Sequence, residues 1–150
     1  MIIEAHSEEE MKAFGVRLAG HFIGGEVVEM IGDVGSGKTT LTKGIAQGLG
    51  VTEDVQSPSF TINRLYDARE GIRLAHYDFY RLGEAGLMAD DLHESIHDPK
   101  TVTVIEWAGI VESELPIDRL TLSFVSPTET SRRIIVEAHG PKSLRIERAL

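Results

Sequence analysis

A glycine-rich stretch at residues 32–39 has the residue types that are needed to bind a polyphosphate. It reads Gly-Asp-Val-Gly-Ser-Gly-Lys-Thr and matches the G-x-x-x-x-G-K-[ST] phosphate-binding loop completely. In such a loop the glycines let successive backbone N–H groups point at the phosphates, while Lys38 supplies positive charge and the Thr39 hydroxyl can ligate Mg²⁺. We therefore expect a nucleotide site formed by Asp33, Val34, Gly35, Ser36, Gly37, Lys38, Thr39 and Thr40.

The sequence on either side of this loop predicts the strand and the helix that the chemistry requires. Residues 26–31 form a short β-branched apolar run, and residues 40–49 carry apolar side chains at helical spacing. Gly50 then stands where a helix C-cap glycine belongs. The glycines at 44 and 48 are four residues apart, which predicts a flat helix face that packs closely on the sheet.

Two acidic residues at predicted strand ends could complete the site. A phosphate loop needs a carboxylate to help hold Mg²⁺, usually at the end of a neighbouring apolar strand. Asp78 and Glu106 both satisfy this condition. A solvated acid at a strand end is the alternative for each, but two such acids in one small domain with a phosphate loop favour the functional interpretation. Residues 57–61 (Ser-Pro-Ser-Phe-Thr) follow the predicted helix and are either a switch segment near the γ-phosphate or a strand-entry turn.

A second motif competes with this interpretation. Residues 93–97 read His-Glu-Ser-Ile-His and match the H-E-x-x-H pattern of zinc peptidases. Asp98-Pro99 follows at once, which leaves little helix to fix the ligands, and no third ligand stands at a typical distance. We therefore expect a solvated helix face and no zinc. The base-reading N-K-x-D motif of GTPases is absent, since the only asparagine, Asn63, precedes Arg64, and this favours ATP.

Composition restricts the class of protein. A chain of 150 residues with 41% apolar and 26% charged residues is typical of one globular domain, which we expect to span residues 1–150. No apolar run could span a bilayer, and the first residues lack the features of a signal peptide. The absence of cysteine and of targeting segments is compatible with a cytoplasmic protein. A net charge of −9 argues against a broad nucleic-acid-binding face.

The remaining pattern predicts a mixed sheet covered by helices. Ser7 and Glu10 form a capping box ahead of an amphipathic helix at 8–20. A weak helix is expected within 84–97 and a buried strand at 101–105. Two hairpins are expected, one from 59–66 with 72–78 and one from 119–125 with 132–138. We infer an α/β fold: a P-loop NTPase-like three-layer sandwich with a mostly parallel central sheet and antiparallel hairpin additions.

Several strings together resemble the TsaE family of bacterial ATPases. They are G-D-x-G-S-G-K-T-T, S-P-S-F-T, H-Y-D-F-Y-R-L and I-E-W, in family order across about residues 25–125. The resemblance implies an Mg²⁺-dependent ATPase, weak in isolation, that supports the modification of tRNA with threonylcarbamoyladenosine at position 37. It implies association with the TsaB–TsaD pair, through which tRNA would be contacted indirectly, and no membrane.

The resemblance also implies roles for individual residues. Thr39 and Glu106 match the family's Mg²⁺ positions, Asp78 matches an acid required for activity, and Arg133 falls near where the family contacts nucleotide. Asp78 either orients water or ligates the metal through water. Trp107 corresponds to a partner-facing or site-closing residue.

The chain departs from the family pattern at two positions. Ser59 replaces a common threonine and keeps the hydroxyl, whereas Ala108 replaces a proline that commonly follows the E-W pair. The second change puts the geometry of the loop after Trp107 in doubt.

Two other functions fit the phosphate loop. A small-molecule kinase could use Asp78 as a base toward an acceptor hydroxyl, and it predicts ADP formation that depends on a metabolite. A nucleotide-stabilised interaction module predicts ATP binding without turnover. The catalytic residues expected for the ATPase are Lys38, Asp78 and Glu106.

Overall fold

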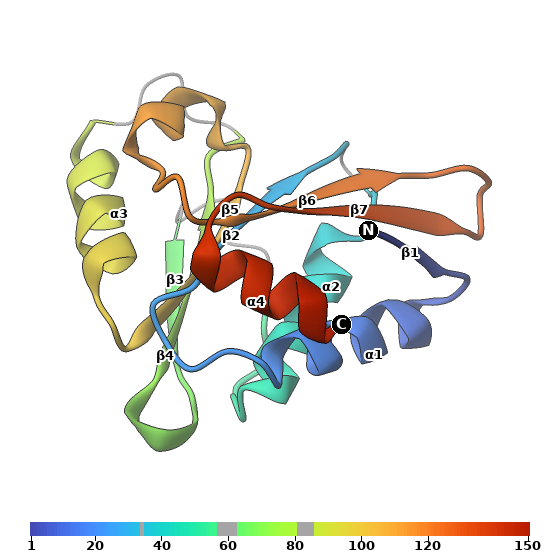
Figure 1. Cartoon of the computed structure of the whole chain (residues 1–150), viewed down its shortest axis with the longest axis horizontal. Helices are drawn as coiled ribbons and strands as arrows, with labels where there is room; N and C mark the ends of the chain where they lie inside the picture. The colour runs from blue at the N-terminus through green and yellow to red at the C-terminus, as the bar shows by residue number, and fades with distance from the viewer. Residues whose placement is uncertain (34, 57–62, 81–85) are drawn as a thin grey trace.

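The computed structural model describes residues 1–33, 35–56, 63–80 and 86–150, which form one mixed sheet with helices on both faces (Figure 1). The seven strands of this part of the chain lie in the order β1-β7-β6-β2-β5-β4-β3. The strands are β1 (Ile2–Ala5), β2 (Val27–Ile31), β3 (Asn63–Asp67), β4 (Arg73–Asp78), β5 (Thr101–Glu106), β6 (Leu120–Val125) and β7 (Arg132–Ala138). The α-helices are α1 (Glu8–Ala19), α2 (Lys38–Gly48), α3 (Leu87–His97) and α4 (Pro141–Ala149), and the 3-10 helices are η1 (Arg69–Gly71) and η2 (Ala108–Glu114).

The centre of the sheet is parallel and its edges are antiparallel, as the sequence predicts. Strands β6, β2, β5 and β4 pair in parallel, whereas β3 joins β4, β7 joins β6 and β1 joins β7 in antiparallel fashion. Both predicted hairpins are present, β3–β4 and β6–β7. Residues 59–62 of the first predicted hairpin lie outside the described residues.

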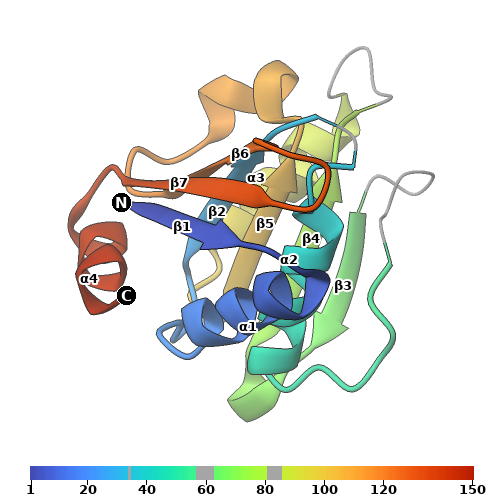
Figure 2. The ribbon, with the colours of Figure 1, turned by 90° about the vertical axis from the view of Figure 1, so that its right-hand side faces the viewer.

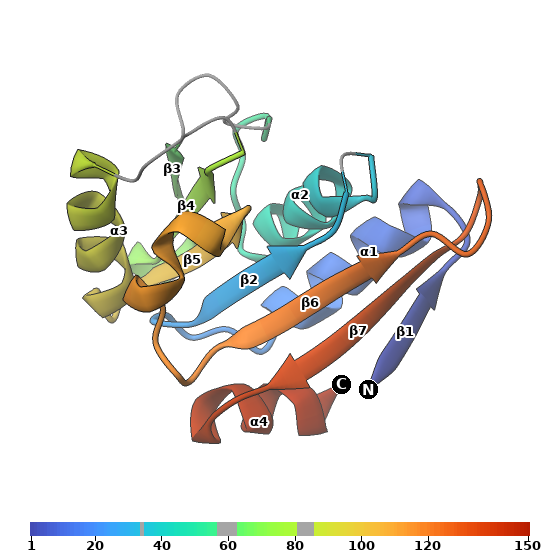
Figure 3. The same ribbon diagram turned by 90° about the horizontal axis from the view of Figure 1, so that it is seen from above.

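Helices on both faces bury the centre of the sheet. Helices α1 and α2 lie side by side on one face, and α3 with η2 covers the β4–β5 part of the other (Figures 2 and 3). Every residue of β5 is consequently buried. The β6–β7–β1 part of that second face carries no helix in Figure 3, and along residues 133–137 of β7 more exposed side chains alternate with buried ones. The result is a layered α/β structure that presents the carboxyl ends of β2, β4 and β5 at one edge.

The glycine stripe on α2 packs against α1, so the expectation that it packs on the sheet is wrong. A Cβ added at Gly44 would lie 2.3 Å from the Lys12 carbonyl oxygen, and one added at Gly48 would lie 2.7 Å from the Ala19 Cβ. Gly15 on α1 faces the same seam, since its added Cβ would lie 2.6 Å from the Leu41 carbonyl oxygen. The three glycines let the two helix backbones approach each other, which fixes the start of α1 beside the start of α2.

The capping of α1 follows the predicted pattern with one change. The Ser7 hydroxyl accepts a hydrogen bond from the Glu10 N–H at 3.1 Å, as in a capping box. The Glu10 carboxylate reaches back to the N–H of His6 (3.1 Å), one residue before the N-cap. Gly50 has a positive φ of 82° just after the end of α2, as the sequence predicts.

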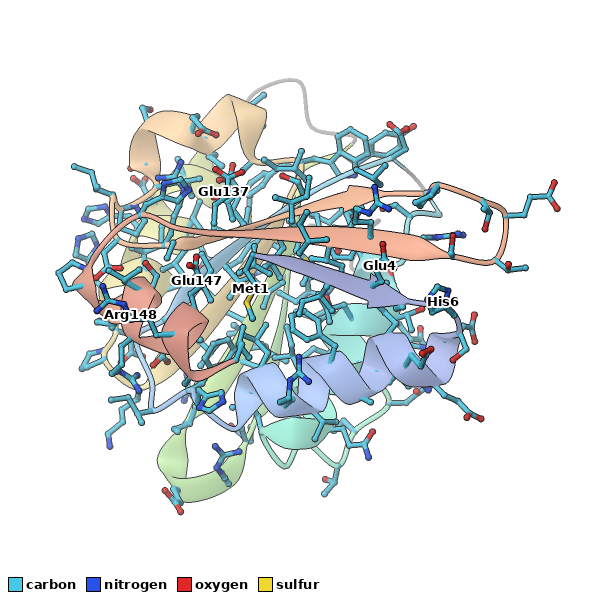
Figure 4. The ribbon with its side chains drawn as sticks, turned by 45° about the vertical axis from the view of Figure 1, so that its right-hand side comes forward. Met1, Glu4, His6, Glu137, Glu147 and Arg148 are labelled. Atoms are coloured by element: carbon cyan, nitrogen blue, oxygen red, sulfur yellow. The ribbon has the colours of Figure 1, made fainter. Side chains whose placement is uncertain are left out.

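The sequence patterns do not predict strand β1, helix α4 or the 3-10 helix η2. Strand β1 pairs with β7, which places Ile2 opposite Ile135 and Ala5 opposite Arg132. In Figure 4, Met1 lies at one end of β1, and Glu4 and His6 lie toward the end that leads into α1. Helix α4 follows β7 and buries Ile146 in the core on the α1 side. In the described part of the chain, no helix is long and apolar enough to cross a membrane.

Candidate nucleotide site

The phosphate loop connects β2 to α2 and turns on two glycines. Gly35 and Gly37 have φ of 80° and 106°, which side chains with a Cβ rarely adopt, and Gly37 is the N-cap of α2. The helix therefore begins at Lys38 with its N-terminal N–H groups directed at the space over the loop, where an anion is favoured. Val34 lies outside the described residues.

Lys38 is held by the loop and by the strand ends around it. Its ammonium donates a hydrogen bond to the Gly32 carbonyl at 2.6 Å and lies 3.9 Å from Glu106 Oε1. It also lies 4.1 Å from the ring centroid of Trp107. Burial lowers the pKa of Lys38, although the carboxylates of Glu106, Asp78 and Asp33 act in the opposite direction. The Lys38 ammonium is thus fixed behind the loop, with buried carboxylates beside it.

The two candidate carboxylates stand next to each other on adjacent parallel strands. Asp78 ends β4 and Glu106 ends β5, and the two residues are direct partners in the register. Both side chains are buried, with exposed fractions of 7% and 3%. Asp78 Oδ1 accepts a hydrogen bond from the Tyr80 N–H at 2.9 Å, which orients the carboxylate after the strand has ended.

A cavity of about 660 Å³ brings these groups together. It is lined by Ala5, His6, Ser7, Glu8, Met11, Gly35, Gly37, Lys38, Thr39, Thr40, Asp78, Tyr80, Glu106, Trp107, Glu129, Thr130 and Arg132. Five segments of the sequence contribute: the β1–α1 junction, the phosphate loop, the end of β4, the end of β5, and the β6–β7 turn. Of the other predicted loop residues, Asp33 is exposed and Ser36 is buried, and neither lines the cavity.

The structure brings Arg132 to the cavity and leaves Arg133 outside it. Arg133 points the other way from β7, and its guanidinium pairs with Glu4 at 2.9 Å. Arg132 lines the cavity, and its guanidinium donates to the Gly35 carbonyl of the phosphate loop at 3.4 Å. Adjacent residues of a strand face opposite sides of a sheet, so the sequence position of an arginine pair does not by itself say which one faces the site.

No motif or spacing in the sequence identifies the lining residues of the β1–α1 junction, such as Ala5 and His6. The β1–α1 junction reaches the cavity only because β1 pairs with β7 and α1 packs on α2. Residues 57–61, predicted to be a switch segment or a strand-entry turn, lie outside the described residues.

Trp107 lines one side of the cavity and has an unusual backbone conformation. Its φ of 57° and ψ of 50° are left-handed, which costs on the order of 1–3 kcal/mol for a residue with a side chain. The Tyr80 ring packs on its indole at 4.8 Å, and the indole in turn covers Lys38. The role of Trp107, partner-facing or site-closing, stays a prediction. Ala108, which replaces the proline that is common in the family after the E-W pair, is buried and begins η2.

The histidine pair of the competing motif is located elsewhere. His93 and His97 lie on α3, which packs on the opposite face of the sheet, and their rings are 4.2 Å apart. His97 Nδ1 donates to the His93 carbonyl at 2.8 Å. Within the described ranges, no cluster of three or more His, Asp or Glu side chains is arranged to hold a metal ion.

The strand–loop–helix unit at the centre of this sheet defines a P-loop NTPase-like α/β fold. The model of one protein family, described as "Threonylcarbamoyl adenosine biosynthesis protein TsaE", matches residues 5–134. The chain belongs to the TsaE family, whose role is in the biosynthesis of threonylcarbamoyladenosine on tRNA.

Individual relatives agree with this assignment. The chain is 38% identical over 135 residues to the Bacillus subtilis tRNA threonylcarbamoyladenosine biosynthesis protein TsaE, covering 88% of this chain and 82% of that protein. It is 40% identical over 113 residues to the Streptomyces coelicolor TsaE protein, covering 75% and 76% of the two chains. The crystal structure of Bacillus subtilis YdiB superposes with a TM-score of 0.79 at 34% identity, covering 99% of this chain and 93% of that one.

Proposed function

We propose that this protein is an Mg²⁺-dependent ATPase that supports the threonylcarbamoyladenosine modification of tRNA at position 37. It is weak alone and is activated in the cytoplasm by the TsaB–TsaD pair. One observation carries the proposal: Lys38, Thr39, Asp78 and Glu106 line a single cavity at the start of α2. Tight apposition of a lysine, a hydroxyl and two buried carboxylates around a phosphate loop suits phosphoryl chemistry.

The residues present fit ATP with Mg²⁺. This ion is usually held by one or two carboxylates together with phosphate oxygens and water, so a cage of three protein ligands is not required. Thr39 and Glu106 would hold the metal, and the loop N–H groups with Lys38 would hold the phosphates. When bound, Mg²⁺-ATP supplies the phosphoryl group and the divalent charge that offsets the charge developing on its oxygens.

The remaining side chains position the reaction. Lys38 exchanges its hydrogen bond with the Gly32 carbonyl for one with a phosphate oxygen, because the charged acceptor makes the stronger bond. Asp78 either orients water or ligates the metal through water. Trp107 and Tyr80 exclude bulk water from this side of the cavity. Arg132, rather than Arg133, contacts the nucleotide.

Protein partners supply the link to tRNA. The net charge of −9 leaves the chain poorly suited to neutralise an RNA backbone on its own. Docking on a TsaB–TsaD pair that holds the tRNA removes this requirement. The Bacillus subtilis and Streptomyces coelicolor relatives are tRNA threonylcarbamoyladenosine biosynthesis proteins, which supports a role of this chain with the same modification machinery.

ATP turnover by the purified chain, with and without the TsaB–TsaD pair, tests the proposal. We expect a rise on adding the pair and a drop of at least tenfold in Lys38→Ala, which corresponds to about 1.4 kcal/mol of barrier. Lys43→Ala is the matched control, since Lys43 is on the same helix outside the cavity lining.

The other outcomes identify the rival functions. Turnover that ignores the pair and requires a metabolite would indicate a small-molecule kinase. ATP binding without turnover, even with the pair present, would indicate a nucleotide-stabilised interaction module.

A further inference from the structure

His76 lies inside β4, and its ring contacts Glu106 directly. The side chain is fully buried, and its Nε2 lies 2.5 Å from Glu106 Oε2. His76 and Asp78 are two residues apart on one strand, so both side chains project from the same face of the sheet, toward α2. The histidine therefore stands directly behind the carboxylate pair of the site, on the side away from the cavity, since it does not line the cavity.

The two oxygens of Glu106 have different neighbours. Oε2 is bound by His76, whereas Oε1 lies 3.9 Å from the Lys38 ammonium and faces the phosphate loop. The terminal torsion of a glutamate is broad, so an unrestrained carboxylate can rotate over a wide range. A fixed donor on Oε2 removes this freedom and presents Oε1 to the start of α2, where Thr39 lies.

The hydrogen-bond pattern also assigns the tautomer of the His76 imidazole. Nε2 must carry a hydrogen in order to donate to the carboxylate, while Nδ1 has no hydrogen-bond partner among the described residues. Of the two tautomers, the one with its hydrogen on Nε2 leaves only an acceptor unsatisfied. The opposite tautomer would place two acceptors against each other and bury an unpaired N–H.

We propose that His76 is a positioning residue that holds the Glu106 carboxylate in the orientation that binds Mg²⁺. This inference rests on the proposed function, because it deepens the role of Glu106. Hydrogen-bond partners behind a metal ligand commonly change metal affinity or activity by 10–100-fold when they are removed. The role differs from core packing because it acts through a single oxygen of Glu106.

The Mg²⁺ dependence of ATP affinity tests this role without relying on turnover. Calorimetric titration with ATP over a series of Mg²⁺ concentrations gives the Mg²⁺ concentration of half-maximal effect. We expect His76→Leu to raise this concentration at least about tenfold, with ATP affinity in EDTA unchanged. His76→Gln should restore most of the loss, because its amide places an N–H near the position of Nε2. His76→Asn is the matched control, since its shorter side chain cannot reach Oε2.

A double-mutant cycle with Glu106→Gln separates positioning from packing. If His76 acts through Glu106, adding His76→Leu to Glu106→Gln causes no further change in Mg²⁺ dependence. Additive effects of the two substitutions would overturn the inference, as would a Gln variant that behaves like the Leu and Asn variants. If the Leu variant does not fold, the comparison of the Gln and Asn variants decides the question. If the ATP affinity of the wild-type protein does not change with Mg²⁺ concentration, the proposed function itself is overturned.

Discussion

The seam between α1 and α2 provides a sharp test of the packing argument. Gly44 lies where the two helix backbones are closest, and Gly44→Ala adds a single methyl group there. That Cβ would lie 2.3 Å from the Lys12 carbonyl oxygen and 2.9 Å from the Lys12 Cα, whereas real contacts essentially never fall below 3.0 Å. Because the obstructing atoms belong to the backbone, no side-chain rotation can relieve the contact.

The magnitude follows from two opposing effects. Alanine is favoured over glycine inside a helix by about 1 kcal/mol, which acts to stabilise the variant. Overpacking a tight interface costs ~1–3 kcal/mol, and the rigid backbone contact places this case at the upper end. We therefore expect a net loss of about 2 kcal/mol in the free energy of unfolding. For a chain of 150 residues this lowers Tm by roughly 4–8 °C.

Thermal unfolding followed by circular dichroism measures this loss, with Gly20→Ala as the control. Gly20 has an ordinary φ of −60°, and the nearest atom to its added Cβ is 3.3 Å away. The control should be neutral or stabilised by up to about 1 kcal/mol. A Gly44→Ala variant that melts at or above the temperature of the control would refute the close-packing argument.

The remaining predictions concern the site and the C-terminal helix. Arg132→Ala should weaken ATP binding, measured by calorimetry, about tenfold or more, as expected for a lost charged hydrogen bond. Arg133→Ala should leave ATP affinity within about twofold of wild type, because Arg133 pairs with Glu4 outside the cavity. The reverse ranking would contradict the assignment. ATP should change the emission of Trp107, the only tryptophan, because binding draws the Lys38 ammonium away from its ring, and Lys38→Met should lose this change. Asp118 caps α4: burial acts to raise its pKa, but hydrogen bonds from Ser143 and the Lys142 N–H bring it below the ordinary 3.8. Because the folded state binds a proton on Asp118 less readily than the unfolded state, the Asp118 carboxylate stabilises the wild-type protein fully above pH 3.8, and this contribution disappears as the pH falls through the lowered pKa. The Asp118→Asn variant should therefore be less stable than wild type only above this range. A difference in urea midpoint between the two proteins that persists at about pH 2 would count against this linkage.

The local features of this chain are predictable, and the pairings between distant segments are not. The phosphate loop, α2 and both hairpins follow from motifs and short-range periodicity. Strand β1 is only a short run beside the start of the chain, and its pairing with β7 is a contact that no local pattern encodes. The partner of the Gly44 stripe could not be inferred for the same reason, since a flat helix face fits a sheet or another helix equally well.

The site shows the same division. Residue types and strand ends identify Lys38, Asp78 and Glu106, because each stands at a position that the motif itself defines. The choice between Arg132 and Arg133 depends on the phase of β7, and a shift of one residue reverses it. His76 begins the string H-Y-D-F-Y-R-L, but its contact with Glu106 depends on the register between β4 and β5 and could not be read from that string.

The pairing of β1 with β7 also makes the cavity a late product of synthesis. Ala5 and Arg132 are register partners on these strands, and both line the cavity, yet almost the whole chain separates them. A nascent chain therefore carries the phosphate loop and both carboxylates before the walls that flank them exist. Contacts of such long sequence separation also form slowly during folding. The complete cavity therefore forms only after β7 has been synthesised and has paired with β6 and β1.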